Sequence, residues 1–324
     1  MKAVLVHNVG PQSELRIGEV AAPVCSPGEV LIDVKAAGVN RADLLQRAGK
    51  YPPPAGASEL LGLEVSGVVS MVGEGSSNIS VGDNVCALLA GGGYAEKVAV
   101  PAIQTMPIPL GLSFVEAAAI PEAFVTAYAN LEKEANLRGG ERVLLHGGAS
   151  GVGTAAIQIA RKIGAYVACT VGSDSKVQRC KDLGAECVVN YKTEDFATGI
   201  RRWAPEGVDL ILDIVGKEYL SRNLSLLGQR GRLVQIATMS GAIAEINLSI
   251  LMSKRIRLIG SVLRSRSIEE KGALVAEFFT QYGEMFSQKE LRPVVSATFT
   301  LKDVELAHEM MRRSEHVGKI VLEI

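Results

Sequence analysis

The stretch that decides the fold is Arg142-Val-Leu-Leu-His-Gly-Gly-Ala-Ser-Gly-Val-Gly153, an apolar strand that leads into a glycine-rich turn. The run Thr154-Ala-Ala-Ile-Gln-Ile-Ala-Arg-Lys-Ile163 follows, with apolar side chains at helical spacing. A second apolar strand, residues 165–171, comes directly after Gly164. A turn without bulky side chains lets backbone N–H groups and the positive end of the helix approach a pyrophosphate. This β-α-β unit therefore predicts dinucleotide binding.

The turn departs at one position from the G-x-G-x-x-G spacing of dinucleotide-binding turns. It reads Gly148-Ala-Ser-Gly-Val-Gly153, so Ser150 replaces the middle glycine, and Gly151 and Val152 begin the helix. A short hydroxyl side chain still allows a phosphate to come close. The spacing alone also occurs in ordinary tight turns, and it is the strand before and the helix after that favour the dinucleotide. The hydrolase pattern G-x-S-x-G fails because Val152 stands where the last glycine should be.

The end of the second strand sets the choice of dinucleotide, because an acidic residue there binds the ribose 2′-hydroxyl and repels a 2′-phosphate. Here the strand ends in Gly172 and Ser173. Lys176 begins the next helix and Tyr191 ends the third strand, so a cation and a hydroxyl converge on a phosphate. These residues predict NADPH as the cofactor. In the alternative, Asp174 binds the ribose and Lys176 is a solvated charge, although we interpret Asp174 as a helix cap.

Composition excludes several classes of protein. The 324 residues are 48% hydrophobic and carry a formal net charge of -1, which gives no attraction to nucleic acid or to an anionic membrane. No apolar run approaches the ~18 residues of a membrane span, and we expect a cytoplasmic enzyme without nucleic-acid or membrane partners. The five cysteines are odd in number and lack C-x-x-C spacing, so neither disulfides nor a structural zinc is expected.

The pattern of predicted strands and helices along the chain indicates two domains. Residues 142–262 alternate short β-branched strands with helices, as in a doubly wound parallel sheet of the α/β class. The first 120 residues have short strands broken by glycine and proline, which favours a β-rich domain. After Arg264 we expect one long helical run and a terminal strand, residues 318–324, that returns to the first domain. The predicted boundaries are 1–121 with 264–324, and 122–263, with a bridging helix over 124–137 and a cleft between the domains.

Several phrases carry a family resemblance. They are Gly38-Val-Asn-Arg-Ala-Asp-Leu-Leu-Gln-Arg47, Gly62-Leu-Glu-Val-Ser-Gly67, Val81-Gly-Asp-Asn-Val85 and Ala117-Ala-Ala-Ile-Pro-Glu122, together with the glycine-rich turn. With them the chain resembles the medium-chain dehydrogenase/reductase superfamily in its zeta-crystallin-like NADPH:quinone oxidoreductase branch. Residues 51–58 and 263–266 are most similar to the tumour-suppressor-induced subgroup found in animals. The resemblance implies a GroES-like catalytic domain, a Rossmann domain and a homodimer.

The chain departs from the zinc-dependent branch of this superfamily at all three ligand positions. Asn40 stands where the first cysteine ligand would be, Gly62-Leu-Glu64 replaces Gly-His-Glu, and no cysteine lies near Pro121. Because no metal is then present to polarise an alcohol or carbonyl, the acceptor must take hydride readily. Quinones, with ortho-quinones as good acceptors, and alkenes conjugated to a carbonyl meet this condition. The sequence therefore predicts a zinc-independent NADPH:quinone oxidoreductase.

The resemblance also places the site residues. Asn40 and Tyr51 are expected to donate hydrogen bonds to the acceptor, and Thr126 to lie near the nicotinamide. Arg264 is expected to reach the cofactor or the acceptor. Asp43 and Gln46 are weaker candidates for the site. In the alternative interpretation, Asn40 and Asp43 only form a turn or a helix cap, and Tyr51 is an ordinary loop aromatic. Two other functions stay open: reduction of 2-enoyl thioesters or alkenals with Tyr51 as proton donor, and a low-turnover NADPH-binding partner protein, which the lack of basic clusters disfavours.

Overall fold

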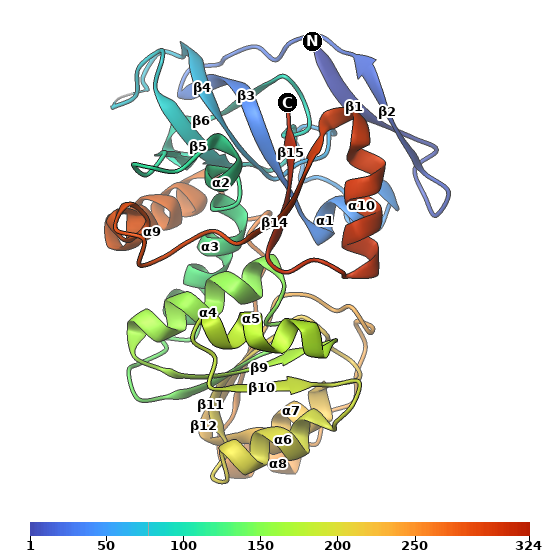
Figure 1. The fold of residues 1–324 in the computed structure, drawn as a ribbon, viewed down its shortest axis with the longest axis vertical. Coiled ribbons are helices and arrows are strands. Elements are labelled where there is room, and N and C mark those ends of the chain that lie inside the picture. Colours follow the sequence, from blue (N-terminus) through green and yellow to red (C-terminus); the bar gives the residue numbers. More distant parts are fainter. Residues whose placement is uncertain (77) are drawn as a thin grey trace. The chain divides into compact units, whose positions relative to one another are not determined.

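The computed structural model describes residues 1–76 and 78–324, and the chain divides into two compact units. The first unit contains residues Met1–Val125 and Leu263–Ile324, and the second contains Thr126–Val262. Both are drawn in Figure 1. Among the described residues, no helix has the length and apolar character needed to cross a bilayer.

The second unit is built on a six-stranded sheet in which every strand runs parallel to its neighbours. Its order is β10-β9-β8-β11-β12-β13, so the chain moves outward from β8 in one direction and then from β11 in the other. The strands are β8 (Arg142–Leu145), β9 (Tyr166–Val171), β10 (Cys187–Asn190), β11 (Val208–Asp213), β12 (Leu227–Gln235) and β13 (Arg257–Gly260). This is the doubly wound sheet that the alternating texture predicted.

Helices cover both faces of this sheet. Figure 1 shows α4 and α5 on one side and α6, α7 and α8 on the other. They are α4 (Gly151–Ile163), α5 (Val177–Asp182), α6 (Phe196–Trp203), α7 (Leu220–Leu226) and α8 (Leu248–Lys254), with the short turn η3 (Asp174–Lys176) before α5. The helix α4 ends at Gly164, whose φ of 87° closes the last turn in the left-handed conformation that glycine adopts without strain.

The outermost strand β13 has a partner on one side only among the described residues. Its residues are mostly exposed, and Leu258 (43%) and Val262 (48%) are large apolar side chains at this edge. An exposed apolar edge invites pairing with another strand, and pairing with its copy across a two-fold axis removes the edge. We therefore predict a homodimer. Light scattering at micromolar concentration is expected to give twice the 34.3 kDa chain mass, and a mass of one chain would contradict the prediction.

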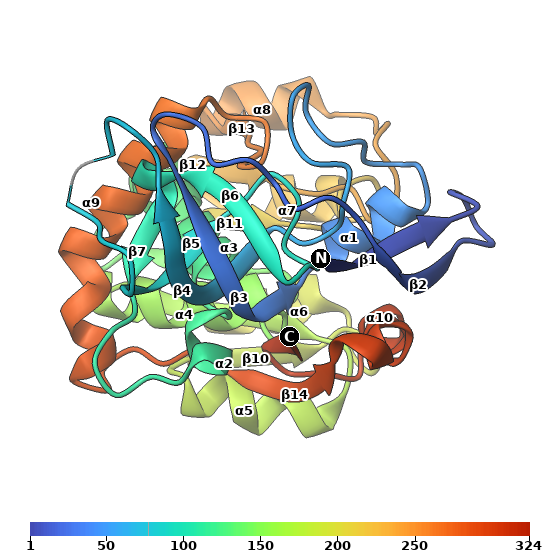
Figure 2. The same cartoon turned by 90° about the horizontal axis from the view of Figure 1, so that it is seen from above.

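The first unit contains a mixed sheet with the order β14-β15-β3-β4-β5-β7, in which β6 also pairs with β3. Figure 2 looks onto its strands from above. They are β3 (Glu29–Val39), β4 (Glu64–Val72), β5 (Asn84–Leu88), β6 (Lys97–Pro101), β7 (Thr105–Pro107), β14 (Val295–Thr300) and β15 (Lys319–Glu323), beside the hairpin of β1 (Lys2–His7) and β2 (Glu14–Glu19). The terminal strand β15 pairs antiparallel with β3, which confirms the predicted return of the chain to the first domain.

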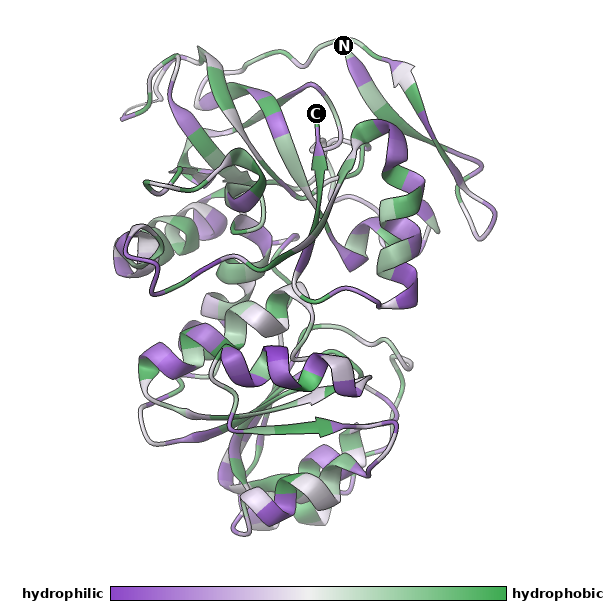
Figure 3. Cartoon of the chain, in the orientation of Figure 1, coloured by the Kyte–Doolittle hydropathy of each residue, from purple (hydrophilic) through white to green (hydrophobic). Residues whose placement is uncertain are grey.

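Helices of the first unit are short except near the C-terminus. They are α1 (Arg41–Arg47), η1 (Ala102–Gln104), α2 (Phe114–Ala117), α9 (Ile268–Ser287), η4 (Leu301–Asp303) and α10 (Val304–Arg313). The single helical run expected after Arg264 is wrong, because β14 and α10 lie between α9 and β15. In Figure 3 hydrophobic and hydrophilic bands alternate along α10, whose apolar face packs into the core of this unit.

One helix carries the chain from the first unit into the second. α3 (Pro121–Tyr128) begins with a proline at a position where no backbone N–H is needed. It continues into η2 (Ala129–Glu134), a π-helical segment, so the helix begins three residues before the predicted 124 and changes its hydrogen-bond spacing halfway. Such π-helical turns are rare and often lie at functional sites.

Candidate functional site

The glycine-rich turn after β8 is held by the neighbouring strand β9. Gly147 has a φ of 71°, a left-handed conformation that favours glycine. Its N–H donates to the Thr170 hydroxyl at 3.2 Å, and the N–H of Gly148 donates to the Thr170 carbonyl at 2.9 Å. The sequence pattern begins one residue later, at Gly148, so Gly147 is a turn glycine that the pattern missed.

The N-terminus of α4 fits a bound phosphate. Ser150 caps the helix, and its Oγ accepts the N–H of Gly153 at 3.0 Å. The next N–H groups, of Gly151 and Val152, lie in the first turn of the helix, where no helix carbonyl precedes them. A Cβ on Gly153 would lie 2.2 Å from the carbonyl oxygen of Gly147. The turn therefore packs against the helix so closely that only glycine fits at 153, as a dinucleotide-binding turn requires.

A buried polar chain fixes the other side of this turn. His146 Nε2 donates to Asn223 Oδ1 at 2.8 Å, and Asn223 Nδ2 donates to Asp213 at 3.0 Å. The His146 Nδ1 then accepts the hydroxyl of Thr170 at 3.1 Å. Burial lowers the pKa of His146 to about 4, so the ring is neutral in this arrangement. The hydrogen bonds run from Thr170 to His146, from His146 to Asn223 and from Asn223 to Asp213, and they link the ends of β8, β9 and β11.

The predicted specificity residues lie at the same edge of the sheet. The hydroxyl of Tyr191 would contact a Cβ on Gly172 at 2.7 Å, so the tyrosine lies directly over that glycine. Ser173 bonds the Ser175 hydroxyl at 2.9 Å, and Lys176 ends the η3 turn. The interpretation of Asp174 as a cap is wrong, because its carboxylate accepts the Asn190 side-chain N–H at 2.7 Å. That bond uses Oδ1 of Asp174, so the alternative in which this acid binds the ribose stays open.

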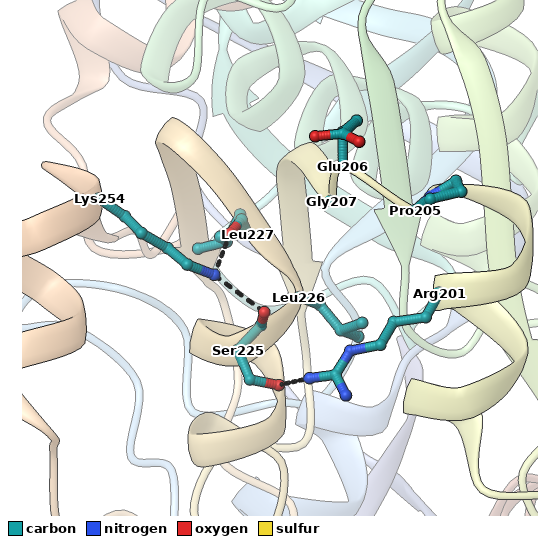
Figure 4. Close-up of a pocket in the computed structure, with 8 residues that line it drawn as sticks. All are labelled: Arg201, Pro205, Glu206, Gly207, Ser225, Leu226, Leu227 and Lys254. Atoms are coloured by element: carbon teal, nitrogen blue, oxygen red, sulfur yellow. Dashed lines mark hydrogen bonds between the residues drawn. The ribbon is translucent and has the colours of Figure 1, made fainter.

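A small pocket lies at the opposite edge of the sheet, where β11 and β12 begin (Figure 4). Its two cations, Lys254 and Arg201, already bond the protein. Lys254 Nζ donates to the carbonyl of Ser225 at 2.9 Å and to that of Leu227 at 2.6 Å, and Arg201 donates to the Ser225 hydroxyl at 3.0 Å. Both cations therefore hold groups of the protein itself. The pocket lies at the amino ends of β11 and β12, whereas a dinucleotide binds at the carboxyl ends of the strands, so it is not the dinucleotide site.

In the first unit, a buried ammonium bonds Asn40 and Glu64, residues at or beside the positions of the metal ligands in the zinc-dependent branch. Lys319 Nζ donates to Glu64 Oε1 at 2.5 Å, to Asn40 Oδ1 at 2.6 Å and to the Val39 carbonyl at 3.0 Å. The Lys319 and Glu64 side chains are 4% and 0% exposed. The register explains the pair, because β4 and β15 flank β3 and both residues begin their strands. A Cβ on Gly38 would lie 2.2 Å from Glu64 Oε1, so glycine at 38 makes room for the carboxylate.

These residues do not suit a zinc ion. An ammonium with three oxygen partners already supplies the positive charge that Glu64 needs, and zinc sites use thiolate, imidazole and carboxylate ligands. Asn40 contributes an amide, and Leu63 stands where the histidine ligand would be. Within residues 1–76 and 78–324, no group of three His, Cys, Asp or Glu side chains is placed to hold a metal.

Asn40 therefore has another role than the free donor that the sequence suggested. Its Nδ2 donates to Glu64 Oε1 at 3.0 Å and to the Gly38 carbonyl at 3.3 Å, and its Oδ1 accepts Lys319. Both N–H groups of the amide are thus used inside the protein. Asn40 also precedes α1 and forms a capping box with Asp43, as the alternative interpretation allowed. Asn40 positions Glu64 and Lys319.

Asp43 leads into a second part of the same buried network. Its carboxylate accepts the N–H of Asn40 at 2.8 Å, the N–H of Gly62 at 3.1 Å and the hydroxyl of Tyr94 at 2.8 Å. Burial raises the pKa of Asp43 to about 6, while these three donors oppose the shift. The Tyr94 oxygen lies 3.3 Å from His308 Nε2. Asp43 is fully buried, so it shapes the loop and does not reach a substrate.

Tyr51 and Arg264 lie together in the first unit. The guanidinium carbon of Arg264 is 5.2 Å from the centre of the Tyr51 ring, a cation–π contact. Arg264 also donates to Gln46 Oε1 at 2.7 Å and to the Ala90 carbonyl at 2.8 Å. The structure thus groups Arg264 with Tyr51 and Gln46. Burial, followed by the charge of Glu122, raises the pKa of Tyr51, so its hydroxyl stays protonated at neutral pH.

Glu122 is another residue of this cluster that the sequence did not suggest as functional. It lies in the first turn of α3, and its N–H donates to Glu64 Oε2 at 2.8 Å. Burial and then the Glu64 carboxylate raise the pKa of Glu122 to about 8. Thr126, one turn further along α3, is 8% exposed, and its hydroxyl has no hydrogen-bond partner among the described residues. A bound ligand with a polar group would supply the hydrogen-bond partner that the Thr126 hydroxyl lacks among the described residues.

Comparison with known proteins places the chain among oxidoreductases. Residues 26–110 match the alcohol dehydrogenase GroES-like domain, and residues 151–280 match the zinc-binding dehydrogenase domain. Human quinone oxidoreductase is 32% identical over 99% of this chain and 97% of its own length. The synaptic vesicle membrane protein VAT-1 homologue of Danio rerio is 29% identical over 93% of this chain, which spans 65% of that protein.

Solved structures agree with the sequence relatives. Escherichia coli quinone oxidoreductase complexed with NADPH has a TM-score of 0.87 and 29% identity, and covers 100% of this chain and 99% of its own. The JamJ enoyl reductase has a TM-score of 0.87 and 28% identity, with 99% and 98% covered. The first unit therefore contains a GroES-like domain, and the second contains a Rossmann-like nucleotide-binding domain of a dehydrogenase.

Proposed function

Because the chain belongs to the quinone oxidoreductase branch of the medium-chain dehydrogenase/reductase superfamily, we propose that it uses NADPH to reduce a quinone without zinc. The observation that carries this proposal is the buried ammonium of Lys319, bonded to Glu64 and Asn40. A side-chain cation with all its hydrogens engaged cannot polarise a substrate oxygen as a metal does. An acceptor that takes hydride readily, such as an ortho-quinone, suits this site.

The residues at the carboxyl edge of the parallel sheet fit the cofactor. The pyrophosphate would lie at the N–H groups of Gly151 and Val152, with Ser150 beside it, at a turn whose close packing Gly148 and Gly153 allow. Gly172, Ser173, Lys176 and Tyr191 would bind the ribose and its 2′-phosphate. When bound, NADPH supplies the hydride.

On the acceptor side, the Tyr51 hydroxyl is proposed to bond the oxygen on which negative charge develops. Arg264 holds the Tyr51 ring and adds positive charge behind it, while Gln46 anchors Arg264. Thr126 is proposed to bond the nicotinamide end of the cofactor. We place the enzyme in the cytoplasm as a homodimer whose partners are small molecules.

Steady-state oxidation of NADPH against ortho-quinones, para-quinones and 2-enoyl thioesters tests the function. The quinones, ortho-quinones above all, are expected to give the largest kcat/KM. The similarity to the JamJ enoyl reductase favours one other candidate, reduction of an enoyl thioester or alkenal double bond. If kcat/KM is larger for enoyl thioesters, the substrates are of that class and not quinones. If no acceptor is turned over, the protein binds NADPH without acting as an enzyme on these acceptors.

The cofactor preference can be tested at Lys176. A charge-assisted bond from its ammonium to the 2′-phosphate contributes roughly 1.5–3 kcal/mol. Lys176→Ala is therefore expected to weaken NADPH binding by about ten- to a hundredfold and to leave NADH binding nearly unchanged. Fluorescence titration of both cofactors measures this. If the unmodified protein prefers NADH, the interpretation of this strand end is wrong.

Tyr51→Phe tests the acceptor side, because it removes the hydroxyl and keeps the ring on Arg264. The variant is expected to reduce kcat/KM for a good ortho-quinone by about three- to a hundredfold, with NADPH affinity nearly unchanged. Asn40→Ala is expected to reduce kcat/KM over the same range, now through displacement of Glu64 and Lys319, and to lower the melting temperature as well. If kcat/KM is unaltered in both variants, the acceptor does not bind beside Tyr51.

A further inference from the structure

Three carboxyl groups lie near the buried ammonium of Lys319 in the first unit. Glu64 and Asp43 are both 0% exposed, and Glu122 packs against Glu64 through its backbone N–H. Lys319 is the cation bonded to a carboxylate in this cluster. Arg264 and the buried Lys271 are further cations near these acids, but the guanidinium of Arg264 bonds neutral oxygens of Gln46 and Ala90. Because Glu64 and Asp43 are completely covered, solvent does not screen their charges, and the repulsion among the three acids favours a proton on one of them.

Hydrogen bonds decide which carboxyl group holds that proton. Glu64 accepts the ammonium of Lys319, the amide of Asn40 and the N–H of Glu122. Asp43 also accepts three donors, so both groups are stabilised as anions. Within residues 1–76 and 78–324, no hydrogen bond reaches the carboxyl group of Glu122. Glu122 is therefore the group on which a proton is most stable.

Glu122 is also the member of this set that can exchange a proton with a ligand. Its side chain is partly exposed, whereas Glu64 and Asp43 are completely covered. The pKa of Glu122 is raised to about 8, because burial and then the Glu64 carboxylate outweigh the opposing charges of Lys319 and Arg264. The groups that act on Glu122 electrostatically, besides these, are Asp43, Tyr51 and Lys271.

We propose that the Glu122 carboxyl group is protonated at neutral pH and donates its proton to the reduced acceptor beside Tyr51. The proposal rests on the proposed function. The quinone gains hydride from NADPH, and the O–H bond of Glu122 breaks as an O–H bond forms on the acceptor oxygen, which yields the hydroquinone. Solvent then returns a proton to the Glu122 carboxylate. Glu122 would thus be a catalytic residue for the proton, and Tyr51 the donor that orients the oxygen.

Infrared difference titration tests the protonation without any turnover. The unmodified protein is expected to show the carbonyl band of a protonated carboxylic acid that disappears with a midpoint near pH 8. Glu122→Gln should remove this band, and Glu59→Gln, which changes an exposed acid of the same unit, should retain it. A titrating band that persists in Glu122→Gln would place the proton on another group and overturn the proposal.

Kinetics test the donation. For a good ortho-quinone, kcat of the unmodified enzyme is expected to fall as pH rises through about 8, because the ionised Glu122 has no proton to give. Glu122→Gln should lower kcat by about ten- to a hundredfold at pH 7 and abolish this fall, with NADPH affinity unchanged. Glu122→Asp, which keeps a carboxyl group, should restore part of the rate and the fall with pH. Glu59→Gln should behave like the unmodified enzyme.

The outcomes separate the two proposals. An active enzyme whose rate and pH profile are the same in Glu122→Gln would overturn the donation and leave the proposed function intact. If the unmodified protein reduces no quinone, the proposed function fails and the donation fails with it. The infrared band still decides in that case whether Glu122 holds the proton.

Discussion

Gly153→Ala is expected to weaken NADPH binding by about a hundredfold or more, which corresponds to roughly 2.7 kcal/mol. The added Cβ would lie 2.2 Å from the carbonyl oxygen of Gly147 and 2.7 Å from the carbonyl group of Gly148. Both are backbone atoms, so no side chain can turn away to relieve the contact, and the turn must separate from the helix. The N–H groups that face the pyrophosphate would then lose their alignment. Titration of the folded variant with NADPH measures the effect.

The matched control is Gly260→Ala in β13 of the same unit. A Cβ at Gly260 meets nothing within 4 Å, and its φ is not positive, so alanine is accommodated without strain. NADPH affinity is expected to stay close to that of the unmodified protein. If Gly153→Ala also binds NADPH normally, the assignment of this turn to the pyrophosphate is wrong.

Lys319→Met is expected to destabilise the protein by about 3–5 kcal/mol, because it leaves the Glu64 carboxylate buried without its cation. The Glu64 side chain is completely covered, so solvent cannot replace the lost charge. The substitution keeps the side-chain length, which limits the loss of packing. Urea unfolding, followed by a signal from the first unit, measures the change in the free energy of unfolding.

Two variants show whether charge is the cause. Glu64→Gln combined with Lys319→Met removes both ions, and it should recover a large part of the stability that Lys319→Met alone loses. Lys50→Met, at an exposed lysine, should have little effect. Equal stability of Lys319→Met and Lys50→Met would show that the buried pair contributes little to folding.

The fold of the second unit could be predicted because its determinants are local in the sequence. The helix after the turn at Gly148 has apolar residues at 3.6-residue spacing, and the flanking strands are short, β-branched and bounded by glycine. Each element therefore carries its own pattern, and the order of the elements implies the parallel sheet. The same local patterns did not show β14 and α10, because a run of charged and apolar residues after Arg264 is compatible with one long helix.

The buried network of the first unit could not be predicted for a different reason. Lys319 and Glu64 meet only because β4 and β15 lie on either side of β3, and no spacing in the sequence connects them. The sequence drew attention to Asn40 as a vacated ligand position but could not show that its amide is fully used by Glu64 and the Gly38 carbonyl. A lysine just after a glycine, before an apolar strand, is an ordinary strand start. Its burial is a property of the assembled sheet.

The interrupted course of the chain through the first unit also constrains how the protein is made. The second unit is encoded between the two segments of the first, so a ribosome completes the whole parallel sheet before it reaches β15. Until Lys319 emerges, Glu64 lacks the ammonium that it binds, and β3 lacks the partner at its edge. Domains generally fold as units, and the inserted domain is therefore the earlier one to finish. Until β15 is made, the N-terminal segment has an unpaired sheet edge at β3. We therefore expect misassembly chiefly during this interval of synthesis.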